Sequence, residues 1–395
     1  MITNILLTDM KHYFLLFILL LVIITIEGCT EELHPETNGT NSPVLNEGEL
    51  TKAVLDLSVN TFAVEAQAET RASIPSNIPE NETSEEKEVH NIWVFQYDAV
   101  TKELLIKPRY YTITDQIMLQ DLPVYLKAGI PSFVYVVTNT GYDNWANDDT
   151  DTSWQKFKNL EQLKKQTLPT AFPLRSIDKV SIPMVGASEE VEVTTGITVT
   201  VPVTRMYAKL KVKVEMLKAE MKLNNVNVRQ IPNICRIETF AGDGNGEPMN
   251  AVPFPDGTTF SSIAFAASDL EKSEDKEWAV FYVPENLQGE IENQGGNKSD
   301  AAPTNALVVD VTAEIGGEKY LYAAYPGGNS LNNFNIQRNQ VYRMTLTITG
   351  EKGQNNPSSN CFVVKPNGFL SFEPYYRVET GGGYNFADYL SPHDE

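Results

Sequence analysis

The chain has 395 residues and a net charge of −21, from 31 Lys and Arg against 52 Asp and Glu. This length is sufficient for two domains with sizeable hydrophobic cores. The charge argues against nucleic acid as a partner, because binding to phosphates needs clustered Lys and Arg. No two of the four histidines stand at metal-ligand spacing, so the sequence predicts no metal and no other cofactor.

The N-terminal region has the parts of a secretory signal. A short positive start precedes an apolar run over residues 13–26, which is shorter than the roughly 20 residues of a membrane-spanning helix. The sequence Ile-Glu-Gly-Cys that ends at Cys29 resembles the lipobox of bacterial lipoproteins. This resemblance predicts a signal peptide over residues 1–28, cleavage between Gly28 and Cys29, and lipidation of Cys29. An uncleaved anchor, or an ordinary signal with a chance cysteine, is the alternative.

Residues 29–50 are rich in Glu, Thr, Asn, Pro and Gly, a composition typical of a flexible stalk. Residues 53–64 then alternate, with Leu55, Leu57 and Val59 on one face, which predicts a half-buried strand. Residues 67–88 contain few apolar side chains and are expected to form an exposed loop, open to proteolysis. The first basic residue of this loop is Arg71, followed by Ala72.

The first domain is predicted over residues 51–203. The segment 89–97 is apolar on both faces and is expected to be a central strand that buries Trp93, Val94 and Phe95. Further strands are predicted at 109–113, 116–122, 133–138 and 191–203. Residues 154–166 predict one helix, because Trp154, Phe157, Leu160 and Leu163 recur at helical spacing.

The second domain is predicted over residues 204–350, where alternation restarts. In the segment 206–216, Met206 and the even-numbered apolar residues are expected to face the core, whereas Tyr207, Lys209, Lys211 and Lys213 are expected to face outward. Later strands are predicted at 278–283, 307–315, 319–325 and 341–348, separated by loops rich in Gly, Asn and Pro. Many short strands with almost no helix indicate an all-β protein built from sandwiches.

Residues 351–395 are too short for a further domain and are interpreted as a protruding C-terminal arm or a truncated third module. Besides Cys29, the chain contains Cys235 and Cys361, which are expected to be free, buried thiols. Pairing of these two cysteines in an oxidising periplasm stays open.

No motif for catalysis is present. The chain has no Gly-x-Ser-x-Gly segment and no Cys/His arrangement, so we expect that it is not an enzyme. The acidic segments 147–151 and 243–247 could surround a cation but do not match a calcium loop, and solvated turns are the preferred interpretation. Tyr142, Trp145 and Trp154 could form a platform for stacking a sugar, although the helical spacing of Trp154 favours a place in the core.

Four stretches together resemble one family. They are Val-His-Asn-Ile-Trp-Val-Phe from Val89, Phe-Tyr-Val-Pro-Glu-Asn from Phe281, the segment from Phe334 to Arg343, and the lipobox followed by the acidic residues Glu31 and Glu32. Taken together and in chain order, they resemble the fimbrillin family, the pilins of Bacteroidetes type V pili, over residues 29–350. The acidic pair also resembles the signal that exports lipoproteins to the outer face of the outer membrane.

The resemblance implies an all-β fold of two tandem transthyretin-like Greek-key β-sandwich domains, with one short helix in the first. It also implies a fimbrial subunit that serves adhesion, located in the fimbrium and anchored in the cell outer membrane through its lipid. A trypsin-like protease would cut between Arg71 and Ala72 and remove the strand at 53–64. A strand from another pilus subunit would then fill the groove by β-strand addition.

The segment 362–372 of the arm is one candidate for such a donor strand. The resemblance does not distinguish stalk, tip and anchor subunits. The alternative function is that of a monomeric surface lipoprotein that binds a glycan, a host ligand or another bacterial surface.

Overall fold

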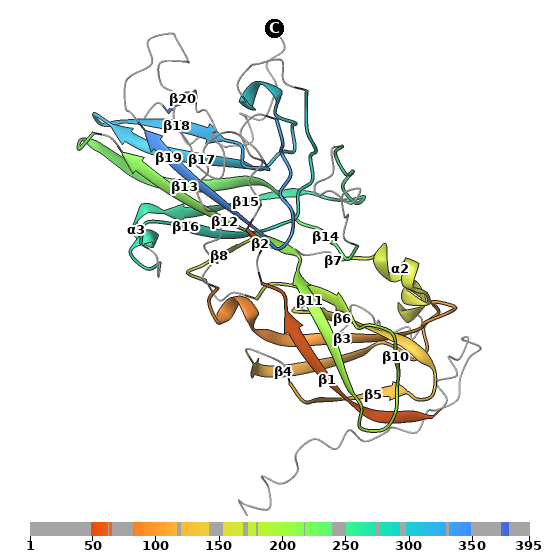
Figure 1. Cartoon of the computed structure of the whole chain (residues 1–395). Helices are drawn as coiled ribbons and strands as arrows, with labels where there is room; N and C mark the ends of the chain where they lie inside the picture. The colour runs from red at the N-terminus through yellow and green to blue at the C-terminus, as the bar shows by residue number, and fades with distance from the viewer. Residues whose placement is uncertain are drawn as a thin grey trace, which may run out of the picture. The chain divides into compact units, whose positions relative to one another are not determined.

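The computed structural model describes residues 49–61, 63–64, 82–116, 120–141, 153–168, 173–178, 181–216, 218–238, 250–273, 276–292, 298–328, 332–348 and 373–378. Within these ranges the protein is all-β, and its strands form three larger sheets and one two-stranded sheet (Figure 1). The predicted all-β fold class is therefore confirmed. All described residues belong to one compact unit that begins at Val44, and the predicted domain boundary at 203/204 stays a prediction.

The first sheet has the strand order β4-β3-β6-β9-β11-β1-β5, with β10 paired to β6. Its strands are β1 (Leu50–Val59), β3 (Val89–Asp98), β4 (Arg109–Gln116), β5 (Leu122–Lys127), β6 (Pro131–Thr138), β9 (Met184–Ala187), β10 (Val191–Glu192) and β11 (Thr198–Arg205). Strands from both ends of this order contribute to one cluster of buried side chains, which includes Leu55, Val94 and Val201. The sheet thus folds over this cluster, which we call the first core.

The second and third sheets face each other. The second has the order β2-β19-β12-β16-β8 and the third has the order β15-β13-β17-β18-β20. The strands of the second sheet are β2 (Ala63–Val64), β8 (Leu174–Arg175), β12 (Tyr207–Met216), β16 (Ala279–Pro284) and β19 (Gln340–Ile348). Those of the third are β13 (Met221–Pro232), β15 (Phe260–Ala266), β17 (Val308–Ile315), β18 (Glu318–Ala324) and β20 (Glu373–Val378). Leu210, Phe281, Val228 and Val309 belong to the second core between these sheets.

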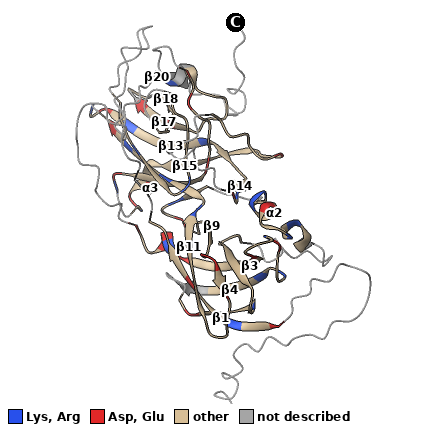
Figure 2. Ribbon diagram, turned by 45° about the vertical axis from the view of Figure 1, so that its right-hand side comes forward, with Lys and Arg blue, Asp and Glu red and all other residues tan. Residues whose placement is uncertain are grey.

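A third cluster, the junction core, joins strands of the first and second sheets. It contains Trp93 and Phe95 of β3, Tyr207 of β12 and Tyr282 of β16. The residues that cover it come from the 3₁₀ helix η2 (Ser153–Phe157) and the helix α2 (Leu160–Lys164). Figure 2, in which Lys, Arg, Asp and Glu are coloured, shows that most of the strand ribbon belongs to other residue types.

The remaining elements are short. A two-stranded sheet pairs β7 (Thr167–Leu168) with β14 (Cys235–Arg236), and single turns of helix lie at η1 (Glu85–Lys87), α3 (Ala267–Leu270) and η3 (Lys298–Ala301). None of the described helices is both long and apolar enough to cross a membrane.

Strand β3 confirms the prediction for residues 89–97. Trp93 and Phe95 have exposed fractions of 0% and belong to the junction core, whereas Val94, at 1%, belongs to the first core. The strand is buried on both faces because different structures cover them: the rest of the first sheet on one side, and the helical segment with the second sheet on the other.

Three predicted elements are wrong in their bounds. The helix predicted at 154–166 is two short helices, because Asn159 is extended and caps α2 by accepting a hydrogen bond from the backbone N of Gln162 at 2.9 Å. The strand predicted at 116–122 is divided between β4 and β5, and Asp121 before β5 has a left-handed φ of 59°. The strand predicted at 191–203 is interrupted by a turn in which Gly196 has a φ of 77°.

The outward face predicted for residues 206–216 is partly wrong. The inward residues from Met206 to Val212 are buried as expected and Val214 is partly buried, but Tyr207 and Lys209 are also buried, with exposed fractions of 2% and 4%. The reason is that the outer face of β12 near its start is covered by the junction core and by Glu86, which lies 2.7 Å from Lys209 Nζ.

Candidate functional site

Strand β1 is the candidate functional element, and it lies between β11 and β5 rather than at an edge of its sheet. It runs parallel to β11, with Val59 opposite Val203, and antiparallel to β5. Backbone hydrogen bonds bracket the parallel pair: Gly196 N donates to Lys52 O at 2.8 Å, and Asn60 N donates to Val203 O at 2.9 Å. Both edges of β1 are thus engaged by the rest of the sheet.

One face of β1 fills the first core. Ala53, Leu55 and Leu57 are buried, with exposed fractions of 0%, 0% and 4%, whereas Ser58 on the opposite face is exposed. The alternation predicted from the sequence is therefore confirmed. Burying each of the two leucines contributes about 1.5–3 kcal/mol.

The chain leaves the first sheet directly after β1. The predicted strand 53–64 is not continuous: it begins at Leu50, ends at Val59, and is followed by β2, which pairs in parallel with β19 of the second sheet. Residues 50–64 consequently contribute strands to two different sheets. The next residues, 65–81, which contain Arg71 and Ala72, lie outside the described ranges.

The chain returns to the described structure at Glu82, and the segment Glu82–Glu88 corrects the prediction of an exposed loop up to residue 88. Glu86 has an exposed fraction of 0%. Its Oε1 accepts from Tyr282 OH at 2.5 Å and lies 2.7 Å from Lys209 Nζ, and its Oε2 accepts from Thr83 N at 3.0 Å. A buried carboxylate is tolerated here because a cation and two further donors surround it.

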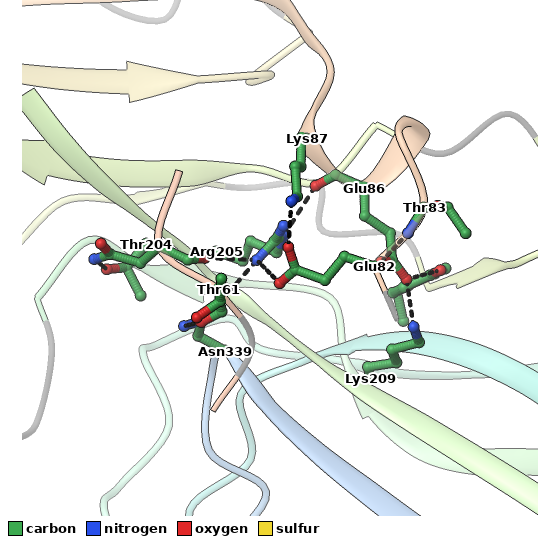
Figure 3. A network of polar contacts seen from close by, with 11 residues as sticks. Thr61, Glu82, Thr83, Glu86, Lys87, Thr204, Arg205, Lys209 and Asn339 are labelled. Atoms are coloured by element: carbon green, nitrogen blue, oxygen red, sulfur yellow. Dashed lines mark hydrogen bonds and ion pairs between the residues drawn. The ribbon is translucent and has the colours of Figure 1, made fainter. Parts of the chain in front are cut away.

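Arg205, at the end of β11, contacts the chain on both sides of the segment 65–81 (Figure 3). Its Nη1 donates to Asn60 O at 2.7 Å on the upstream side. On the downstream side its Nε donates to Glu86 O at 2.9 Å, and Nη1 is 3.3 Å from Glu82 Oε1. Its exposed fraction is 0%. The buried guanidinium therefore holds the two flanks of one segment together.

The electrostatics follow from burial. Burial lowers the pKa of Arg205, while the neighbouring carboxylates of Glu82 and Glu86 oppose that shift. Burial also raises the pKa of Tyr282, and the negative charge of Glu86 adds to the shift. Tyr282 thus keeps its proton, and its hydroxyl group donates a hydrogen bond to Glu86 Oε1.

Asn339 completes the cluster from the turn before β19. Its Nδ2 donates to Thr61 O at 2.8 Å, and its Oδ1 accepts from Arg205 Nη1 at 3.3 Å. Its backbone N donates to Tyr207 O at 2.8 Å, and its φ of 57° is left-handed, a conformation in which Asn is enriched. We call Arg205 and Asn339 the carbonyl-binding pair.

The neighbouring sequence motifs have a structural role. Arg338 forms a buried pair with Glu285, with Nη2 3.0 Å from Oε1 and Nε 3.0 Å from Oε2. The same guanidinium donates from Nη2 to the backbone oxygen of Arg236 at 2.9 Å, next to Cys235. Cys235 is a free, buried thiol as predicted, and burial raises its pKa to about 12.

The residues predicted for lipidation and processing are not among those that the structure describes. Gly28, Cys29, Arg71 and Ala72 are outside the described residues, as are Cys361, the segments 147–151 and 243–247, and the candidate donor strand 362–372. Trp154 is described, and its exposed fraction of 7% places it in the junction core rather than on a sugar-binding platform. Within the described ranges, no group of three or more His, Cys, Asp and Glu could hold a metal ion.

The sequence interpretation missed the cluster formed by Glu82, Glu86, Arg205 and Lys209. The composition of residues 67–88 predicts a loop for the two acidic residues, and the alternation in 206–216 predicts that Lys209 faces solvent. One signal was available: Arg205 ends a strand whose inward positions, Val199, Val201 and Val203, are all valine, so the same alternation places Arg205 inward. A buried arginine requires anionic partners.

Comparison with known proteins gives a short match to a family model. A domain of unknown function (DUF4906) matches residues 281–346, which cover most of the segment from β16 to β19 and include Glu285 and the segment around Asn339. This is a minor part of the chain. No curated protein matches the chain.

Several solved structures are similar to the chain. The tip fimbrial protein Mfa3 from Porphyromonas gingivalis with a C-terminal truncation is 15% identical, at a TM-score of 0.47, over 83% of this chain and 100% of that one. A putative cell adhesion protein from Bacteroides eggerthii is 16% identical, at a TM-score of 0.43, over 85% and 98% of the two chains. The fimbrial anchor protein Mfa2 from Porphyromonas gingivalis is 11% identical, at a TM-score of 0.34, over 82% and 100%.

These neighbours are described as fimbrial and cell adhesion proteins of Bacteroidetes, the class that the sequence motifs resemble. Their TM-scores lie below 0.5, and the likeness carries no detail of function to this chain.

Proposed function

We propose that this chain is a cell-surface fimbrial subunit whose first strand is removed by proteolysis and replaced by a strand from another subunit. The observation that supports this most directly is the place of β1. It is an interior strand of its sheet, yet β1 and the short β2 that follows it are joined to the rest of the fold only through the segment that contains Arg71. One cut after Arg71 therefore frees β1, together with β2, without breaking any other covalent connection.

Removal of β1 would expose a slot of defined chemistry. The slot offers the backbone groups of β11 and β5, and the apolar side chains of the first core that contact Ala53, Leu55 and Leu57. Unpaired backbone groups and exposed apolar surface both favour addition of a new strand. A strand with the same alternation would restore both kinds of contact.

Two further parts of the proposal rest on the sequence. Lipidation of Cys29 would anchor the precursor in the outer membrane, so that processing and assembly take place at the cell surface. The replacing strand would come from another subunit, and adhesion would be the role of the fibre. Cys29→Ala is expected to abolish palmitate labelling and to release the protein from the membrane fraction, and unchanged labelling would refute the anchor.

The central experiment compares the purified precursor with two variants under limited trypsin digestion. The wild type is expected to give a discrete product that begins at Ala72 and then forms ladders on a native gel. Arg71→Ala is expected to remain uncut and monomeric with its fold intact, as measured by circular dichroism. Arg71→Lys is the matched control, because trypsin also cuts after lysine, and it should behave as the wild type.

Two results would contradict the proposal. One is fibre formation by Arg71→Ala protein on cells. The other is a cut wild type that stays a stable monomer, which would support the alternative of a monomeric binding lipoprotein.

A further inference from the structure

The two residues that directly follow β1 are held through their main-chain carbonyls by two side chains. Arg205 Nη1 donates to the carbonyl oxygen of Asn60 at 2.7 Å, and Asn339 Nδ2 donates to that of Thr61 at 2.8 Å (Figure 3). The two acceptors are consecutive in sequence. Arg205 and Asn339 belong to β11 and to the turn before β19, so both remain after a cut in the segment 65–81.

The carbonyl-binding pair is held in place by residues other than those of β1. Arg205 Nε donates to Glu86 O at 2.9 Å, and its Nη1 contacts Glu82 and Asn339. The backbone N of Asn339 donates to Tyr207 O at 2.8 Å. The two donors therefore keep their positions through contacts that the loss of β1 does not remove.

An occupant of the slot can be held through its backbone or through its side chains. The backbone ladder and the alternation of side chains both repeat every two residues, so both are open to strands of other sequences. The contact from Asn60 Nδ2 to Thr204 Oγ1 discriminates by side chain, and a strand of another sequence would lack it. The two carbonyl contacts are independent of sequence and are available to any strand that ends its pairing at the same point.

We infer that Arg205 and Asn339 form a binding site for two consecutive main-chain carbonyls, which anchors the end of the strand that occupies the β1 slot whatever the sequence of that strand. This inference rests on the proposed function, and the occupant after processing is a strand from a second subunit. That strand must run parallel to β11 and must continue for at least two residues beyond the ladder.

The test uses the full chain cut by trypsin, after the protease has been inhibited. A fluorescent synthetic peptide with the sequence of residues 49–66 is added in excess, and its exchange into the slot is followed by anisotropy. A second peptide carries an ester in place of the amide between Thr61 and Phe62, which weakens the carbonyl of Thr61 as an acceptor. The peptides are compared on the wild type and on Asn339→Asp.

Asn339→Asp is nearly isosteric and retains the oxygen that accepts from Arg205, but it loses the donor to Thr61. The ester is expected to weaken binding to the wild type by about 5–10-fold, the value of one hydrogen bond. The amide peptide should bind to Asn339→Asp at least about 5-fold more weakly than to the wild type. On the Asn339→Asp protein, the affinities of the ester peptide and the amide peptide should differ by less than about 2-fold.

Asn233→Asp is the matched control, because it makes the same change of charge at a side chain whose Oδ1 accepts from Thr259 N, away from β1. It should bind both peptides as the wild type does. Asn339→Gly is the second variant if Asn339→Asp does not fold, because glycine tolerates the left-handed φ and also lacks the donor.

The inference would be overturned if replacing the amide peptide by the ester peptide lowered affinity equally on the wild type and on the Asn339 variant. That result would leave strand replacement intact. Failure of the cut chain to exchange any peptide would instead refute strand replacement and, with it, the inference.

Discussion

Lys209 and Glu86 form an ion pair with almost no access to solvent: the side chains have exposed fractions of 5% and 0%, and the charged atoms lie 2.7 Å apart. Taking both charges out of water is costly, so the pair adds little net stability compared with apolar residues of the same size. Removing one partner is different, because the other charge then remains buried without its counter-charge.

Lys209→Met is therefore expected to lower the free energy of unfolding by about 3–5 kcal/mol in urea titrations. The double variant Lys209→Met with Glu86→Gln should recover part of this loss, because no carboxylate is then left unpaired. If the double variant lost as much free energy of unfolding as the two single variants, Lys209→Met and Glu86→Gln, lose together, the two side chains would act independently.

Tyr282 predicts a dependence of stability on alkaline pH. Its pKa is raised in the folded protein by burial and by Glu86, whereas an unfolded tyrosine ionises near pH 10. Below that pH both states hold the proton and stability does not change. Above it the unfolded state releases the proton while the folded state keeps it, so the free energy of unfolding falls as pH rises.

Tyr282→Phe should make this fall less steep, by up to about 1.4 kcal/mol per pH unit above about pH 10. Tyr125→Phe is the matched control, since it makes the same change at a tyrosine that is 45% exposed. The measurement is urea unfolding at a series of pH values. If the free energy of unfolding fell equally steeply with pH in Tyr282→Phe and the wild type, Tyr282 would not be the cause of the fall.

At the scale of elements, β1 provides a prediction that separates its buried face from its exposed one. Leu57→Ala is expected to destabilise the precursor by about 2–5 kcal/mol, because it leaves a cavity in the first core. Ser58→Ala, on the exposed face of the same strand, should change stability by less than about 0.5 kcal/mol. After cutting with trypsin, the segment that carries Leu57→Ala should dissociate faster, as measured by size-exclusion chromatography. Equal effects of the two variants would show that β1 is not anchored through this face.

The elements that the sequence predicted well are those whose periodicity reflects a single environment. Strands β1, β3 and β17 have clean patterns because each face meets one kind of surroundings along its length. Strand β13 was missed although it spans twelve residues. It contains Asn224, Asn225 and Asn227, residues depleted in strands, and its pairing is interrupted by register shifts.

The candidate site was predictable only in part. The alternation of β1 and the position of Arg71 can be read from adjacent residues. The carbonyl-binding pair cannot be read from the sequence, because Arg205 and Asn339 are 134 positions apart and meet only through the pairing of strands in two sheets. The burial of Lys209 was missed for the same reason: the periodicity of β12 predicts which face is outward, but not that Glu86 covers it.

At the scale of the whole molecule, the junction core predicts cooperative unfolding of the first and second sheets. Trp93 of β3 and Tyr282 of β16 lie in the same buried cluster, and residues from both sides of the predicted domain boundary contribute to it. Trp93→Ala is expected to destabilise the protein by about 3–5 kcal/mol. Hydrogen exchange should show the lost protection in β12 and β16 as well as in β3. Loss confined to the first sheet would show that the two sheets unfold as separate units.

The parallel pairing of β1 with β11 has a consequence for symmetry. A slot that accepts a segment in one direction, from a different region of a second copy, makes a contact between unlike surfaces, which a two-fold axis cannot generate. Repetition of such a contact does not stop at a dimer. Under the proposed strand replacement, and where the rotation between copies does not close a ring, it would continue as an open chain in which every copy points the same way, so that one terminus presents a vacant slot and the other an unused strand. Because the slot and the donated strand are unlike surfaces, such a polymer would have two chemically different ends and would add new copies unequally at each.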